Sequence, residues 1–198
     1  MKNISRIGLV CALVLLFCLP ALRAAPLMSL DQAAPLFQGF QGTFVLYDEA
    51  AAQYAVYNQP QSEKRLTPCS SFKIYNSLIA LETGAAVDET MVIAWNGQPS
   101  SITAWNRDHT MASAIQNSVV WYYQALAERI GPQRMQQNLD ALPYGNRDIS
   151  GGIDRFWLHS TLTISAREQV ELLSRLYQDD LPFSSRNMAI VRKIILQS

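Results

Sequence analysis

The chain of 198 residues carries no net formal charge at neutral pH, and 49% of its residues are hydrophobic. This length and composition predict one domain with a substantial core. The balance of charges gives no electrostatic case for binding to nucleic acid or to an anionic membrane.

Residues 1–24 predict a cleavable secretory signal peptide. Lys2 and Arg6 form a positive start, a short apolar run follows at 7–19, and Ala24 is a small residue suited to the cleavage point. Cleavage leaves a domain at 25–198 with three fewer basic residues and a net charge of −3. We therefore expect a periplasmic protein without a stable membrane partner. The sequence makes no prediction of the oligomeric state.

The predicted elements begin with a small sheet region. A short helix is expected at 29–37. Two stretches at 42–47 and 53–57 are rich in β-branched and aromatic residues, and the short segment between them predicts a β-hairpin. A polar loop at 58–67 then leads to a helix that opens at Ser70.

Helices dominate the rest of the chain. The Ser70 helix is expected to end at Gly84, a common C-terminal cap, and residues 87–105 are expected to form a loop. Ser165 and Glu168 form a capping box before an apolar pattern that runs to Tyr177. The remaining helices are predicted at 110–117, 119–130, 133–142 and 187–196, with a break at Gly131-Pro132 and a loop at 144–152.

Ser70-Ser71-Phe72-Lys73 is the most informative motif. Side chains three residues apart share one helix face, so Ser70 Oγ and Lys73 Nζ can approach each other locally. Serine needs a nearby base to act as a nucleophile, and Lys73 can be that base only without its positive charge. The chain has four lysines, and Lys73 lies in an apolar segment, where burial favours the neutral amine. The alternative is a helix-capping serine followed by a solvated lysine.

Three further motifs follow in the chain: Ser118 between two predicted helices, Tyr144-Gly145-Asn146 in a loop, and Phe156-Trp157-Leu158 before the capping box. Taken singly, each has a structural explanation as a helix cap, a turn and core packing. In this order and spacing, together with Ser70-x-x-Lys73, the set resembles the class D (oxacillinase-type) serine β-lactamases. The resemblance extends over nearly all of the domain.

The resemblance implies a mixed α/β (α+β) fold of the serine β-lactamase and penicillin-binding-protein transpeptidase type, with a helical lobe and an antiparallel-sheet lobe. It implies hydrolysis of the β-lactam ring of penicillin-type antibiotics, and hence antibiotic resistance, through an acyl-enzyme on Ser70. The implied partners are therefore small-molecule β-lactams and not nucleic acid.

The resemblance also implies the site roles. Lys73, N-carboxylated by CO₂, would be the base, and Ser118 would pass a proton to the leaving nitrogen. Trp157 would donate its indole N–H to the carbamate. Apolar walls would come from Val120, Phe72 and Leu158, and Tyr144, Gly145 and Asn146 would be structural residues near the site. Beyond the covalently bound CO₂, no cofactor is implied.

Cysteine and histidine add no further site. Cys11 and Cys18 lie in the predicted signal peptide, so Cys69 stands alone and an intrachain disulfide in the mature domain is excluded. We interpret Cys69 as a small packing residue, because no histidine lies nearby in sequence to activate it. His109 and His159 share no metal-ligand spacing, so we expect no metal.

The family's Lys-Thr-Gly or Lys-Ser-Gly strand has no counterpart in the sequence. The resemblance therefore implies that C-terminal strands and the final helix are missing, including a strand that supplies one oxyanion donor. Two alternatives to an active hydrolase follow: a penicillin-binding sensor domain that does not hydrolyse its ligand, and an inactive truncated remnant. A DD-peptidase is a further alternative, although Trp157 and the apolar walls fit a carbamate better than a protonated lysine.

Overall fold

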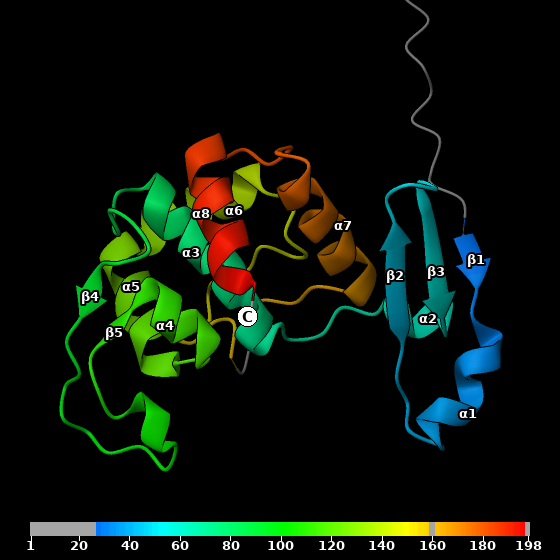
Figure 1. Cartoon of the computed structure of the whole chain (residues 1–198), viewed down its shortest axis with the longest axis horizontal. Coiled ribbons are helices and arrows are strands. Elements are labelled where there is room, and N and C mark those ends of the chain that lie inside the picture. Colours follow the sequence, from blue (N-terminus) through cyan, green and yellow to red (C-terminus); the bar gives the residue numbers. More distant parts are fainter. Residues whose placement is uncertain (1–26, 159–160, 197–198) are drawn as a thin grey trace, which may run out of the picture.

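The structure is a computed structural model in which residues 27–158 and 161–196 are described. The predicted signal peptide and His159 lie outside the described residues. Figure 1 shows a group of helices around α3 and a small sheet beside it, with α7 on the side of the helices that faces β2.

The elements follow one another in this order: β1 (Leu27–Ser29), α1 (Ala34–Phe37), β2 (Phe44–Asp48), β3 (Gln53–Tyr57), α2 (Gln59–Ser62), α3 (Lys73–Glu82), β4 (Val92–Ile93), β5 (His109–Thr110), α4 (Met111–Gln116), α5 (Val120–Ile130), α6 (Pro132–Ala141), α7 (Ala166–Tyr177) and α8 (Ser185–Ile195). Three 3-10 turns lie between them, at Asp31–Ala33, Cys69–Phe72 and Thr103–Trp105.

The sheet has the strand order β1-β3-β2. The predicted hairpin is confirmed, because β2 and β3 pair antiparallel with Val45 opposite Val56. β1 adds to the other edge of β3 in parallel, with Leu27 opposite Tyr54, so the sheet is mixed rather than purely antiparallel. The central strand is the buried one, and its residues Tyr54, Ala55 and Val56 contribute to the core.

Helix α3 is buried on nearly all sides, as its apolar sequence predicts. It packs against α5 and α8. The α-helix begins at Lys73 and not at Ser70, because Cys69 has a left-handed backbone (φ 49°) and Cys69–Phe72 form a 3-10 turn. At its other end the helix stops at Glu82, and Gly84 takes a left-handed conformation (φ 71°), as expected for a C-terminal cap.

The helices that follow α3 begin within two residues of the predicted positions. The helix predicted at 29–37 is wrong over its first half, because Leu27–Ser29 form β1 and a 3-10 turn precedes α1, and the predicted loop at 58–67 contains the short helix α2. Thr110 caps α4, Ser165 caps α7 in the predicted capping box with Glu168, and Ser184 caps α8. The segment 87–105 is mostly loop, but it contains β4, which pairs with β5. A strand of two residues is too short to produce an alternating pattern in the sequence.

One continuous hydrophobic core joins α3, α4, α5, α6, α7 and α8. Within residues 27–158 and 161–196, no helix is long and apolar enough to cross a membrane. The same residues hold no group of His, Cys, Asp and Glu side chains that could bind a metal ion.

Candidate active site

Three polar side chains meet at the start of α3. Lys73 Nζ donates to Ser70 Oγ at 2.7 Å and to Ser118 Oγ at 3.1 Å, and Ser118 Oγ donates to Ser70 Oγ at 3.0 Å. Ser70 is exposed to solvent, whereas Lys73 is only 2% exposed. The arrangement therefore presents one hydroxyl outwards with two groups beside it that can exchange protons with it.

Two turns with unusual backbones hold this triangle. Cys69, directly before Ser70, and Ser118 itself both have left-handed backbones, with φ of 49° and 52°. Such conformations are rare for residues other than glycine and cost about 1–3 kcal/mol unless the surroundings enforce them. The Cys69 N–H donates to the carbonyl of Trp157 at 2.9 Å, so one end of the Ser70 turn is fixed to the segment that carries Trp157.

Lys73 lies in surroundings that favour its neutral form. Within the described residues no carboxylate pairs with it, and its Nζ lies 5.8 Å from the centre of the Tyr123 ring. Burial removes the ammonium group from water and lowers the pKa of Lys73 from 10.5 to about 8. At pH 7 about one lysine in ten is then neutral, far more than at the ordinary pKa.

Trp157 is fully buried next to Phe72, with 5.7 Å between their ring centres. Its indole Nε1 has no hydrogen-bond partner among the described residues. A buried N–H without an acceptor costs about 1–3 kcal/mol, so Trp157 is a donor available to an acceptor group in the site. A carboxylate on Lys73 has the acceptor oxygens that such a donor needs.

Tyr144, Gly145 and Asn146 connect Phe72 to the segment that contains Thr161 and Thr163. The Tyr144 ring packs edge-on against Phe72, with 5.4 Å between ring centres. Gly145 has a φ of 50°, and a Cβ there would lie 1.8 Å from the carbonyl oxygen of Thr163. The Asn146 side chain donates to the Thr161 carbonyl at 2.7 Å and accepts from the Thr163 N–H at 2.9 Å.

The three residues predicted to form apolar walls lie on the elements that carry the site. Phe72 is fully buried at the end of the 3-10 turn. Val120 is the first residue of α5, two positions after Ser118, and is half-buried. Leu158 follows Trp157 and packs half-buried against the core. Their contact with a carboxylated lysine stays a prediction.

The interpretation of Cys69 as a packing residue is wrong. Its side chain is exposed, and its thiol is 3.8 Å from the carbonyl oxygen of Leu158. His109, in contrast, is buried between Ser113 Oγ at 2.9 Å and the Ala104 carbonyl at 3.0 Å, which is a structural role.

Two contacts of the site were not predicted from the sequence. The Trp105 indole N–H donates to the carbonyl of Asn117 at 2.9 Å, directly before Ser118. The Gln169 amide on α7 donates to Ser71 Oγ at 2.7 Å, directly after Ser70. No local motif signals either contact, because the partners lie 12 and 98 residues apart.

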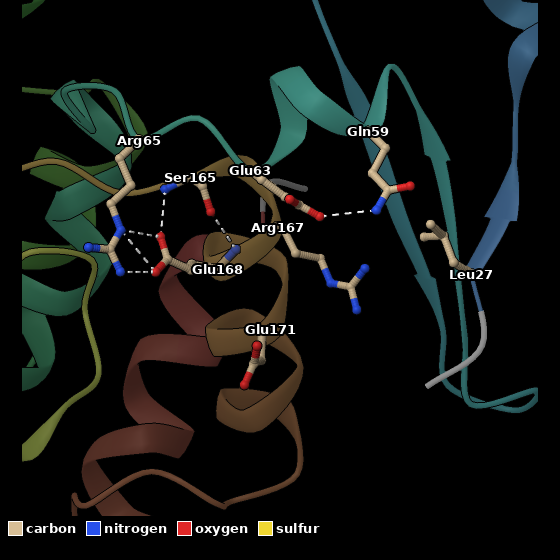
Figure 2. Close-up of a pocket in the computed structure, with 8 residues that line it drawn as sticks. All are labelled: Leu27, Gln59, Glu63, Arg65, Ser165, Arg167, Glu168 and Glu171. Carbon is tan, nitrogen blue, oxygen red and sulfur yellow. Dashed lines mark hydrogen bonds and ion pairs between the residues drawn. The ribbon is translucent and has the colours of Figure 1, made fainter. Parts of the chain in front are cut away.

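A hollow of about 660 Å³ lies elsewhere, between the start of α7 and β1 (Figure 2). Its lining is largely charged, and two of its side chains, Arg65 and Glu168, pair with each other, with Nε 3.1 Å from a carboxylate oxygen. None of the predicted site residues lines this hollow.

Comparisons with known proteins identify the family to which the chain belongs. Residues 42–197 match the family described as the penicillin binding protein transpeptidase domain. The chain is 48% identical over 161 residues to a probable β-lactamase, YbxI, of Bacillus subtilis (strain 168). The aligned residues make up 81% of this chain and 60% of that protein. It is 44% identical over 156 residues to β-lactamase OXA-48 of Klebsiella pneumoniae, covering 79% of this chain and 59% of that protein.

Solved structures give the same result. The class D β-lactamase BAT-2 superimposes with a TM-score of 0.82 at 43% identity, covering 84% of this chain and 70% of that one. A class D β-lactamase from Bacillus subtilis superimposes with a TM-score of 0.81 at 46% identity, covering 86% and 71%. The chain spans about 60% of the length of the curated relatives that it matches. With its serine–lysine–serine triangle on this fold, the chain belongs to the class D β-lactamase family.

Proposed function

We propose that the protein hydrolyses the β-lactam ring of penicillin-type antibiotics through an acyl-enzyme on Ser70, and thereby confers resistance to them. The observation that carries this proposal is the triangle of Ser70, Lys73 and Ser118, in which every edge is 3.1 Å or shorter. The proposal is also supported by relatives named as β-lactamases, which are 44–48% identical to this chain over 156–161 residues.

The positions of the three side chains support the following route to acylation. Ser70 Oγ attacks the lactam carbonyl carbon, and the hydroxyl proton passes to the Lys73 side chain at 2.7 Å. The carbon–nitrogen bond of the ring then breaks, and the departing nitrogen receives a proton from Ser118 Oγ. Lys73 Nζ, 3.1 Å from Ser118 Oγ, replaces that proton. Water subsequently cleaves the Ser70 ester: its proton passes to the Lys73 side chain and from there to the departing Ser70 Oγ, which regenerates the serine hydroxyl.

The residues around Lys73 fit a carboxylated lysine. Only a neutral amine captures CO₂, and burial that lowers the pKa of Lys73 to about 8 supplies the neutral amine near physiological pH. The unpartnered Trp157 Nε1 is the donor that would hold the added carboxylate. When bound, this group supplies an anion that accepts protons at neutral pH.

We also propose that the protein is exported through a cleavable signal peptide to the periplasm. Its positive start, short apolar run and small residue before the cleavage point support this location. In the periplasm a hydrolase meets β-lactam antibiotics before they reach their targets. This compartment therefore suits a resistance enzyme.

Hydrolysis of the chromogenic β-lactam nitrocefin tests the proposal. The native protein should give sustained turnover that rises with added bicarbonate, and Ser70→Ala should give none. Ser150→Ala, which changes an exposed loop serine, serves as a folded control. A single burst equal to the protein concentration would indicate a sensor domain that is acylated without turnover. The complete absence of a burst would indicate an inactive protein and overturn the proposal.

A further inference from the structure

The start of α7 is joined at three places to the segment that leads to the nucleophile. Arg65 pairs with Glu168 in the first turn of α7, as Figure 2 shows. Leu66 and Ile164 exchange backbone hydrogen bonds of 3.0 and 2.9 Å. Farther along, the Gln169 amide reaches Ser71 Oγ at 2.7 Å. The third contact lies next to Ser70, so it is the one able to affect the nucleophile directly.

The polarity of the contact is fixed by its neighbours. Ser71 Oγ lies 2.7 Å from the Pro68 carbonyl, which can only accept, so the hydroxyl proton of Ser71 points to that carbonyl. The lone pairs of Ser71 Oγ are then free to accept, and the NH₂ end of Gln169 is a donor to them. The Ser71 N–H donates to the same carbonyl at 3.2 Å. A relay of hydrogen bonds thus runs from α7 through Ser71 to the Pro68 carbonyl.

These hydrogen bonds hold one end of the turn that contains Ser70. One end of this turn is fixed by the bond from the Cys69 N–H to the Trp157 carbonyl at 2.9 Å. The other end is fixed by Gln169 through Ser71. Between them Ser70 follows a residue with a strained, left-handed backbone, which persists only where neighbouring contacts enforce it.

We propose that Gln169 is a positioning residue for the nucleophile: its amide holds the Ser70 turn in the geometry that places Ser70 Oγ beside Lys73. The proposal rests on the proposed function, because it assigns Gln169 a part in the acylation of Ser70. Gln169 does not touch the reacting atoms. Its effect is transmitted by Ser71 and is therefore expected in the rate of acylation.

Two variants of Gln169 and one control test this role. Gln169→Leu removes the donor, and Gln169→Glu keeps the size but offers only acceptors at neutral pH. Gln178→Leu is the matched control, since Gln178 lies just beyond the other end of α7 and its amide bonds Glu49 and Ser174 at the exposed surface. Each variant is examined by the rate of acylation with a penicillin, followed by intact mass, and by hydrogen exchange of the peptide that contains residues 66–74.

We expect both Gln169 variants to acylate about three- to tenfold more slowly than the native protein, the effect of one lost hydrogen bond. Exchange of the 66–74 peptide should be faster in both, and unchanged in Gln178→Leu. In a Ser71→Ala background, Gln169→Leu should have no further effect on acylation, because the relay is already broken. A merely structural role would instead slow acylation by the same factor in both backgrounds.

Native rates and unchanged exchange in Gln169→Leu and Gln169→Glu would overturn the proposal. Should the native protein itself not be acylated, the proposed function fails, and hydrogen exchange of the 66–74 peptide alone decides whether Gln169 holds the turn. If Gln169→Leu melts at a much lower temperature than the native protein, the conclusion rests on Gln169→Glu, because its side chain has nearly the same shape and disturbs the packing least.

Discussion

Replacing Lys73 with methionine should stabilise the protein at neutral pH while removing its function. Lys73 is 2% exposed and has no carboxylate partner among the described residues, so its ammonium group is buried without compensation by an opposite charge. Methionine has a similar unbranched shape and fills the same space without a charge. The change therefore separates what the lysine contributes to chemistry from what its burial costs in stability.

The size of the effect follows from the pKa of Lys73. Burial lowers this pKa from 10.5 to about 8, which corresponds to about 3 kcal/mol between the charged and neutral forms. Below pH 8 both folded and unfolded states bind the proton, and the folded protein carries the whole penalty. Between pH 8 and 10.5 the unfolded state binds more protons, so the free energy of unfolding rises with pH.

Methionine also loses the hydrogen bonds to Ser70 and Ser118, each of which contributes about 0.5–1.5 kcal/mol. The net gain at pH 7 is then between about 0 and 2 kcal/mol, or up to roughly 8 °C in melting temperature for a protein of this length. Near pH 10.5 the native lysine is neutral, so the difference should vanish or reverse.

Thermal melting and urea denaturation in CO₂-free buffer from pH 7 to 10.5 measure this difference. Lys193→Met is the control, because Lys193 is exposed and pairs with Glu89 at the surface. It should show no such pH window. A Lys73→Met protein that is less stable than native at pH 7, or a difference that stays constant up to pH 10.5, would refute the argument from burial.

Three further outcomes follow from the geometry of the site. Gly145→Ala should cost more than 2 kcal/mol in urea denaturation, because its Cβ meets the Thr163 carbonyl, whereas Gly84→Ala, with open space, should cost about 1 kcal/mol. Ser118→Gly should change the free energy of unfolding by less than about 2 kcal/mol, because glycine suits φ of 52° while the hydrogen bonds to Lys73 and Ser70 are lost, yet slow acylation by about 10²–10⁴. Trp157→Phe should abolish the ¹³C carbamate signal that labelled bicarbonate gives in the native protein; a retained signal would contradict the role of its N–H.

The central part of the site was predictable because it is local. Ser70 and Lys73 are three residues apart, so almost any helical turn brings them together. Ser165 and Glu168 likewise predicted the start of α7, because a serine followed three residues later by a glutamate is typical of a capping box. Ser118 lies far from both in sequence, and its place was predicted only by the resemblance to a family.

The remaining features depend on contacts that no short pattern encodes. The left-handed backbone of Cys69 begins a 3-10 turn where a continuous helix was expected, and the bond to the Trp157 carbonyl helps to fix it. The parallel pairing of β1 with β3 depends on tertiary contacts, since β1 has only three residues. Gln169 lies 98 residues from Ser71, and an amide on the surface of a predicted helix gives no sign of such a partner.

The central claim is that Ser70 is the residue acylated by a β-lactam. The most direct measurement is the intact mass of the protein after brief exposure to a penicillin and acid quenching, followed by peptide mapping. We predict a gain equal to the mass of the whole penicillin molecule, because ring opening releases no leaving group, and we predict that it maps to Ser70 and is absent from Ser70→Ala. An adduct that persists in Ser70→Ala, or that maps to the neighbouring exposed thiol of Cys69, would contradict the account.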